Sequence, residues 1–227
     1  MNTFGPNCKD LLTGRGGGEF AENQIRQIVD GYLKGAFRDP SANEVHQVTS
    51  AILGLHSATC WSVVGSALVG EENFMIEDLL KPKHVFGQFG PGREQSEVFS
   101  CELWSVPTDI LIDWCRQNLK AVGRLFGIAG LFETQQDGSF SWHPTITALL
   151  ERFYREEDSG EIAGNLLSFS SCGSRVPYIQ RRIDLLNQLR GSQNTAVRGL
   201  GDELIPLFEQ QKEAEQKKDD QFRAGIF

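Results

Sequence analysis

The sequence has no apolar run long enough to cross a membrane as a helix. Such a helix needs about 20 residues, and the longest apolar stretch, residues 58–70 (ATCWSVVGSALVG), is shorter and is broken by Gly65. The N-terminus also lacks the basic start and apolar core of a signal peptide. We therefore expect a cytoplasmic protein with no membrane segment, in which residues 58–70 form a buried helix.

Clustered metal-binding residues are also missing. The five cysteines and four histidines contain no CxxC pair and no HExxH motif, which argues against a zinc ribbon or a metalloprotease site. His56 and Cys60 lie one helical turn apart, but two ligands do not make a metal site. We interpret Cys60 as a buried structural thiol. Cys115 stands beside Arg116, but neighbouring residues of a helix point about 100° apart, so the arginine would not face the thiol and Cys115 is interpreted in the same way.

A phosphate-binding loop is absent as well. No GxxxxGK[ST] motif occurs, and RGLGDEL at residues 198–204 lacks the third glycine of a dinucleotide fingerprint and follows a polar turn instead of a strand. We interpret its two glycines as helix-packing or kink residues. The acids of residues 156–161 fall at an expected turn between helices, where solvated charge is normal and Asp158-Ser159 suits a helix cap. The sequence thus predicts no catalytic residue and no cofactor.

Basic residues are outnumbered, with 22 Lys and Arg against 30 Asp and Glu and a net charge of −8. Nucleic-acid binding usually needs a basic surface that displaces counterions from phosphate, so this balance argues against a nucleic-acid partner. A local basic patch remains open, because RVPYIQRR at residues 175–182 holds three arginines.

What the chain does have is helical periodicity, with almost no strand alternation. Apolar residues recur at three- and four-residue steps in residues 20–33 and again in residues 45–55, and a short helix is expected at 73–80. Residues 1–18 are interpreted as a flexible leader. The glycine- and proline-rich residues 81–102 are interpreted as a connector, with a functional loop as the alternative.

Three segments of the second half begin alike, with a proline followed by an amphipathic helix. The prolines are Pro107, Pro144 and Pro177, spaced by 37 and 33 residues, and proline suits the first turn of a helix. Each helix is followed by a break and a second apolar stretch. Helix pairs at such a period are typical of α-solenoids, in which stacked hairpins bury faces that one hairpin cannot.

The third unit resembles a HEAT-type repeat. It has an early proline, the pair Leu185-Leu186, a polar turn, a second helix beginning near Thr195, and a small residue, Gly201, where that family packs its second helix closely. Two features depart from the family: Gly199 adds a second unfavourable glycine to the same turn, and Pro206 should kink or interrupt the second helix.

Residues 103–222 also resemble the C-terminal helical-repeat segments of large bacterial proteins, some of them in phage-defence systems. The shared patterns are a tryptophan-containing helix (LIDWCRQN), a WHP start, the turn GSRVPY and a charged final helix. This resemblance implies a regulatory or sensing segment of a larger assembly as one alternative function. A small enzyme with its site in residues 81–102 is another.

We expect an all-α fold with a helical part at 19–80 and a HEAT-like solenoid of stacked antiparallel helix pairs at 103–227. A charged helix should cap its end. The apolar residues Phe222, Ile226 and Phe227 after it either fold back, which we favour, or dock a partner. The expected function is a non-enzymatic protein–protein interaction or scaffold module, whose acidic field favours basic partners. Its oligomeric state is open. Trp, Tyr and Arg dominate interface hot spots, so the candidate binding residues are Trp104, Trp142, Tyr178, Arg181 and Arg182.

Overall fold

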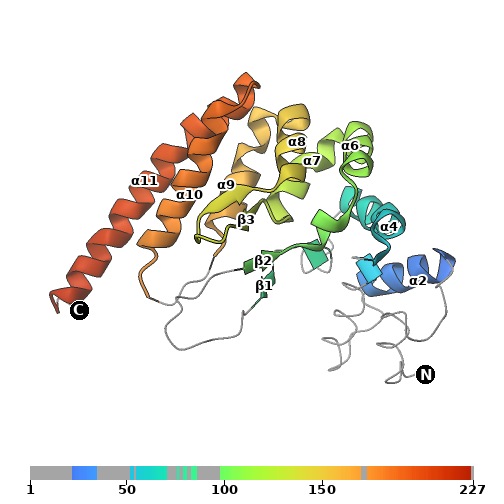
Figure 1. The fold of residues 1–227 in the computed structure, drawn as a ribbon, viewed down its shortest axis with the longest axis horizontal. Coiled ribbons are helices and arrows are strands. Elements are labelled where there is room, and N and C mark those ends of the chain that lie inside the picture. Colours follow the sequence, from blue (N-terminus) through green and yellow to red (C-terminus); the bar gives the residue numbers. More distant parts are fainter. Residues whose placement is uncertain are drawn as a thin grey trace. The chain divides into compact units, whose positions relative to one another are not determined.

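The computed structural model describes residues 22–34, 52–53, 55–70, 76, 79–80, 83–85, 98–169 and 173–225 (Figure 1). Within these ranges the chain is mostly helical, as expected. The leader 1–18, most of 81–102 and the terminal Ile226 and Phe227 lie outside them. Two compact units are present, one formed by Met1–Lys81 with Cys101–Ala121 and the other by Pro82–Ser100 with Val122–Phe227. The expected domain ranges stay a prediction.

The first unit contains α2 (Glu22–Leu33), α4 (Ser57–Val69), the 3₁₀ helix η1 (Glu102–Ser105) and α6 (Thr108–Gln117). Both predicted N-terminal helices that fall on described residues are confirmed. α2 buries Ile25, Val29, Tyr32 and Leu33, the stripe that its periodicity predicts. α4 is apolar on a wider face and buries Cys60, Trp61, Val64, Gly65 and Leu68.

Gly65 allows α6 to approach α4 closely. A Cβ at this position would lie 2.5 Å from Nε1 of Trp114, so only glycine leaves room for the indole. The Trp114 ring then packs edge-on against Trp61, with ring centroids 5.3 Å apart and planes at 74°, an arrangement that aromatic pairs favour.

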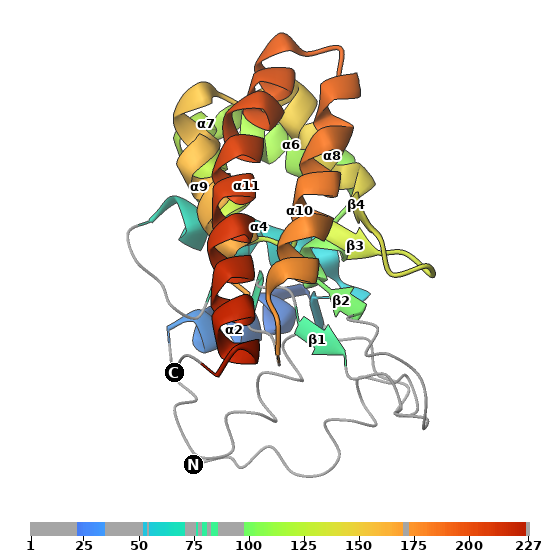
Figure 2. The same ribbon diagram turned by 90° about the vertical axis from the view of Figure 1, so that its left-hand side faces the viewer.

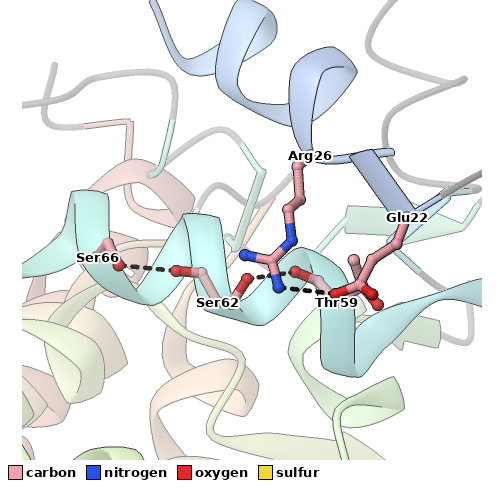
Figure 3. Close-up of polar contacts among 5 residues, drawn as sticks. All are labelled: Glu22, Arg26, Thr59, Ser62 and Ser66. Atoms are coloured by element: carbon pink, nitrogen blue, oxygen red, sulfur yellow. Dashed lines mark hydrogen bonds and ion pairs between the residues drawn. The ribbon is translucent and has the colours of Figure 1, made fainter. Parts of the chain in front are cut away.

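The outer side of α4 carries small hydroxyl residues that bond to their own helix. Ser62 and Ser66 each donate to a carbonyl one turn earlier, those of Thr59 and Ser62, at 2.7 Å (Figure 3). Arg26 of α2 points toward this face and pairs with Glu22 at 2.7 Å (Figure 3). These hydroxyls satisfy local backbone groups, and the exposed ion pair contributes little to stability.

Most of α7 (Leu119–Ile128) belongs to the second unit, which continues with the antiparallel strands β3 (Phe132–Thr134) and β4 (Phe140–Trp142). Phe132 pairs with Trp142 and Thr134 with Phe140. Gly138 closes the hairpin at φ +81°. Asp137 accepts from the hydroxyl and the N–H of Ser139, which lowers its pKa. A second pair, β1 (Lys83–Val85) with β2 (Val98–Ser100), lies at the ends of the glycine-rich segment. The sequence analysis missed both pairs.

The remaining elements are α8 (Pro144–Phe153), η2 (Glu156–Asp158), α9 (Ser159–Leu167), α10 (Val176–Gln188), η3 (Leu189–Gly191) and α11 (Thr195–Arg223). The three proline starts are confirmed: Pro107 precedes α6, and Pro144 and Pro177 lie in the first turns of α8 and α10. The helix predicted near Thr195 begins at that residue. α10 and α11 run side by side in both views (Figures 1 and 2).

Two glycines on one face of α7 leave room for η2 and α9 to pack closely against it. An added Cβ at Gly123 would overlap the Asp158 carboxylate, and one at Gly127 would lie 2.5 Å from Glu161 Oε2. The amide of Asn165 then donates to two carbonyls at the end of α7, both at 2.8 Å. The close approach therefore satisfies the last carbonyl groups of α7.

The structure corrects the expectation for Asp158. It lies at the N-cap position of α9 but makes no capping hydrogen bond, and it is 4% exposed instead of solvated. Its carboxylate accepts from Arg155 at 2.8 and 3.1 Å. Burial against Gly123 excludes water from the Asp158 carboxylate, so Arg155 replaces water as its hydrogen-bond donor.

The two glycines of α11 differ, as their helical positions predicted. A Cβ at Gly201 would lie 3.1 Å from the Leu186 carbonyl oxygen, which confirms its packing role, whereas Gly199 faces open space. Pro206 does not interrupt α11, which continues to Arg223, and the kink given as the alternative stays a prediction. Pro206 lies on the exposed face, where water can bond the carbonyl that it leaves free. The expected fold-back is wrong for Phe222, which is 77% exposed.

We predict opposite effects for two glycine-to-alanine changes. Gly123→Ala forces a methyl group onto the fixed Asp158 carboxylate and should lower the free energy of unfolding by about 1–3 kcal/mol. Gly199→Ala has open space and should raise it by about 0.5–1 kcal/mol, because alanine favours a helix interior. Urea unfolding of both variants measures the difference. Equal shifts would show that α7 and η2 are not packed as described.

Candidate functional site

Several cation–π contacts between arginines and aromatic rings gather where α10 begins, beside the β3–β4 hairpin (Figure 2). We call it the arginine–aromatic cluster. All its members belong to the second unit, and they come from the hairpin, the end of α9 and the first two turns of α10: Phe132, Phe140, Phe169, Arg175, Tyr178, Arg181 and Arg182.

Helical spacing brings the α10 members together. Arg175, Tyr178 and Arg182 follow each other at three- and four-residue steps and so share one face, with Arg181 at its edge. The start of α10 is anchored by Ser174, whose hydroxyl accepts from the Val176 N–H and donates to a carboxylate oxygen of Asp219 on α11.

Arg182 forms the inner layer of the cluster and is 2% exposed. Its Nε donates to the Leu166 carbonyl at the end of α9, and one terminal nitrogen donates to the Tyr178 carbonyl at 3.1 Å. The guanidinium carbon lies 4.0 Å from the ring centroid of Phe169 and 5.5 and 5.6 Å from those of Phe132 and Phe140. A desolvated cation–π contact is worth about 2 kcal/mol or more, so these rings help to stabilise the buried charge.

The outer layer is partly exposed and alternates guanidinium groups with rings. The Arg175 guanidinium lies 4.6 Å from the Phe169 centroid, and that of Arg181 lies 5.7 Å from the rings of Phe140 and Tyr178. The Phe169 and Tyr178 rings stack at 6.0 Å with planes at 29°. Among the described residues, no carboxylate pairs with Arg175 or Arg181.

The structure places the five candidate residues differently. Tyr178, Arg181 and Arg182 belong to the cluster, although Arg182 is buried. Trp142 is also buried, at 8% exposure, and its Nε1 donates to the Leu185 carbonyl at 2.8 Å. It therefore attaches β4 to α10 instead of contacting a partner. Trp104 lies in η1 of the first unit and is not part of the cluster.

The hairpin contribution was missed by sequence analysis. Phe132 and Phe140 pack with their ring centroids 4.5 Å apart and form the hairpin side of the cluster. Gln188 of α10 donates to the Phe140 carbonyl at 2.8 Å. The available signal was Asp137-Gly138 between two aromatic stretches, a pattern typical of tight hairpin turns.

Two other titratable groups of the described residues have shifted pKa values and lie outside the cluster. Burial, with smaller effects of Glu203, Asp158 and Glu156, raises the pKa of Tyr154 to about 12. Burial lowers the pKa of His143, with Glu133 opposing it, and this imidazole caps α8 by accepting from the Thr145 N–H. Of the residues that the structure describes, no three His, Cys, Asp or Glu side chains could hold a metal ion together, and no helix is long and apolar enough to span a membrane.

Comparisons with protein-family models, with curated proteins and with solved structures found no match for this chain. The geometry of the cluster is therefore the basis for assigning a function.

We predict that Arg182 is needed for stability and Arg181 is not. Arg182→Lys keeps the charge but loses the planar guanidinium over the rings, and should lower the free energy of unfolding by about 2 kcal/mol. The neighbouring, partly exposed Arg181→Lys should change it by less than about 0.5 kcal/mol. Urea denaturation tests both, and similar values would argue against the buried position of Arg182.

We also predict two unreactive thiols. Burial raises the pKa of Cys60 and Cys115 from 9.0 to about 12, so alkylation at pH 8, mapped by mass spectrometry, should label them only after unfolding. Because folding favours the protonated thiol, their contribution to stability is complete below pH 9 and is lost as the pH rises toward 12. Labelling of the native protein at the rate of the urea-unfolded chain would contradict this.

Proposed function

We propose that this chain is a non-enzymatic protein-binding module of the cytoplasm and that the arginine–aromatic cluster is its binding surface. We further propose that its helices form HEAT-like stacked pairs. Two features support the stacking: α8 and α9, and α10 and α11, are joined by short connections, and the first helix of each pair begins at a proline.

One observation carries the proposal. Two partly exposed arginines, Arg175 and Arg181, lie over aromatic rings and pair with no described carboxylate, although the chain has 30 acidic residues. Arginine and tyrosine are enriched at interface hot spots because they combine apolar area with directed hydrogen bonds.

Rigidity of the supporting layer strengthens the case. The outer side chains rest on rings and on a helix that Arg182, Trp142 and Gln188 attach to neighbouring elements. A surface that is already ordered loses little conformational entropy when a partner binds. Among the described residues, the groups with shifted pKa values are two buried thiols, a buried phenol, a helix-capping imidazole, a turn carboxylate and the guanidinium of Arg155, which pairs with Asp158. These settings support a binding role.

The test is affinity capture from the native host with the full chain and two charge-matched double variants. Arg175→Glu/Arg181→Glu reverses the cluster, and Arg152→Glu/Arg223→Glu makes the same charge change at exposed positions on α8 and α11. We expect a specific protein to be retained by the native chain and the control and reduced at least about tenfold with the cluster variant.

Circular dichroism and urea unfolding establish that both variants fold. Equal capture by the two variants, or no specific protein retained by the native chain, would overturn the proposed function. The alternatives of a regulatory segment in a bacterial assembly and of an enzyme using residues 81–102 have no observation in their favour among the described residues.

A further inference from the structure

We propose that the cluster recognises an acidic segment of a partner protein, with Arg175 and Arg181 binding its carboxylates and the Phe169–Tyr178 rings packing against an apolar side chain between them. This inference rests on the proposed function and names the chemistry of the partner.

The guanidinium groups of Arg175 and Arg181 have donors that no described residue uses. Each guanidinium carries five N–H donors, and neither Arg175 nor Arg181 donates a hydrogen bond to any described residue. Nearby acids are engaged elsewhere: Asp219 accepts from Ser174, and Asp184 accepts from Gln180 at 2.9 Å. The donors are therefore available to acceptors from outside the chain.

The positions of the two arginines over aromatic rings also suit a carboxylate. A guanidinium that rests on an aromatic face keeps its in-plane N–H groups directed outward, and this fork matches the two oxygens of a carboxylate. The ring beneath reduces the freedom of the arginine before binding. Arg175 also stands at the N-cap position of α10, where the positive end of the helix dipole adds to the attraction of an anion.

The local charge outweighs the net charge at contact distance. The acidic balance of the whole chain predicts a preference for basic partners, but charges are screened beyond about 8 Å at physiological salt. A carboxylate bound at Arg175 would contact its guanidinium group near the positive end of a helix, and a second carboxylate would contact the guanidinium group of Arg181. Basic segments would be repelled by the same groups.

A nucleic acid fits less well than an acidic peptide. Bases can stack on aromatic rings, yet binding a nucleic-acid strand depends on neutralising several phosphates along a basic track. Beyond the two outer arginines, the net charge of −8 opposes such a track. A peptide with a few carboxylates needs only the local pair.

Fluorescence anisotropy with labelled probes and the full chain tests the inference. The probes are a short peptide of glutamates around one phenylalanine, the same peptide with lysine for glutamate, and oligothymidylate. We expect the glutamate peptide alone to bind, to weaken at high salt, and to lose at least about tenfold in affinity with Arg175→Glu/Arg181→Glu. The Arg152→Glu/Arg223→Glu control should bind it as the native chain does.

A charge swap provides the sharpest confirmation, because the cluster variant should gain affinity for the lysine peptide that the native chain rejects. Preference of the native chain for the lysine peptide or for oligothymidylate would overturn the inference. If the glutamate peptide fails while capture from the host still depends on Arg175 and Arg181, the acidic partner is wrong and the proposed function stands. If charge reversal affects neither capture nor peptide binding, both are overturned.

Discussion

Arg182 places a full positive charge inside the second unit, and the elements around it are arranged to stabilise that charge. A buried ion is tolerated only when its donors are bonded and its charge is compensated. Here the carbonyls of Leu166 and Tyr178 accept from it, and three phenylalanine rings lie within 4.0–5.6 Å of its guanidinium carbon. The Arg182 guanidinium thereby contacts the end of α9, the start of α10 and the β3–β4 hairpin.

The same rings connect this interior to the surface. Phe169 contacts the guanidinium groups of both Arg182 and Arg175, and Phe140 contacts those of Arg182 and Arg181. Arg175 and Arg181 therefore lie over rings that also contact the buried Arg182. The guanidinium donors of Arg175 and Arg181 bond to no described residue, which suits recognition of a partner.

Close helix packing elsewhere depends on small residues opposite large or polar ones. Gly65 leaves room for the indole of Trp114, Gly123 leaves room for the carboxylate of Asp158, and Gly201 lies against the Leu186 carbonyl. The resemblance to a HEAT-type repeat predicted the role of Gly201, because that family has a small residue where its second helix packs closely. It did not identify the partner of Gly65 or Gly123, because Trp114 and Asp158 come from distant segments.

The sequence by itself determined which segments are helical and where several of them begin. Apolar periodicity, the prolines at 107, 144 and 177, and the polar turn before Thr195 act within a few residues, so α2, α4, α6, α8, α10 and α11 could be predicted. Of the three candidates on α10, Tyr178 and Arg181 are partly exposed, and their binding role stays a prediction. Only the tertiary structure decided that Arg182 is buried, that Asp158 is enclosed, that Pro206 leaves α11 unbroken and that the hairpin supplies Phe132 and Phe140. Pro206 leaves α11 unbroken because it lies on the exposed face of the helix. The other outcomes depend on contacts between segments far apart in the chain, which local pattern does not encode.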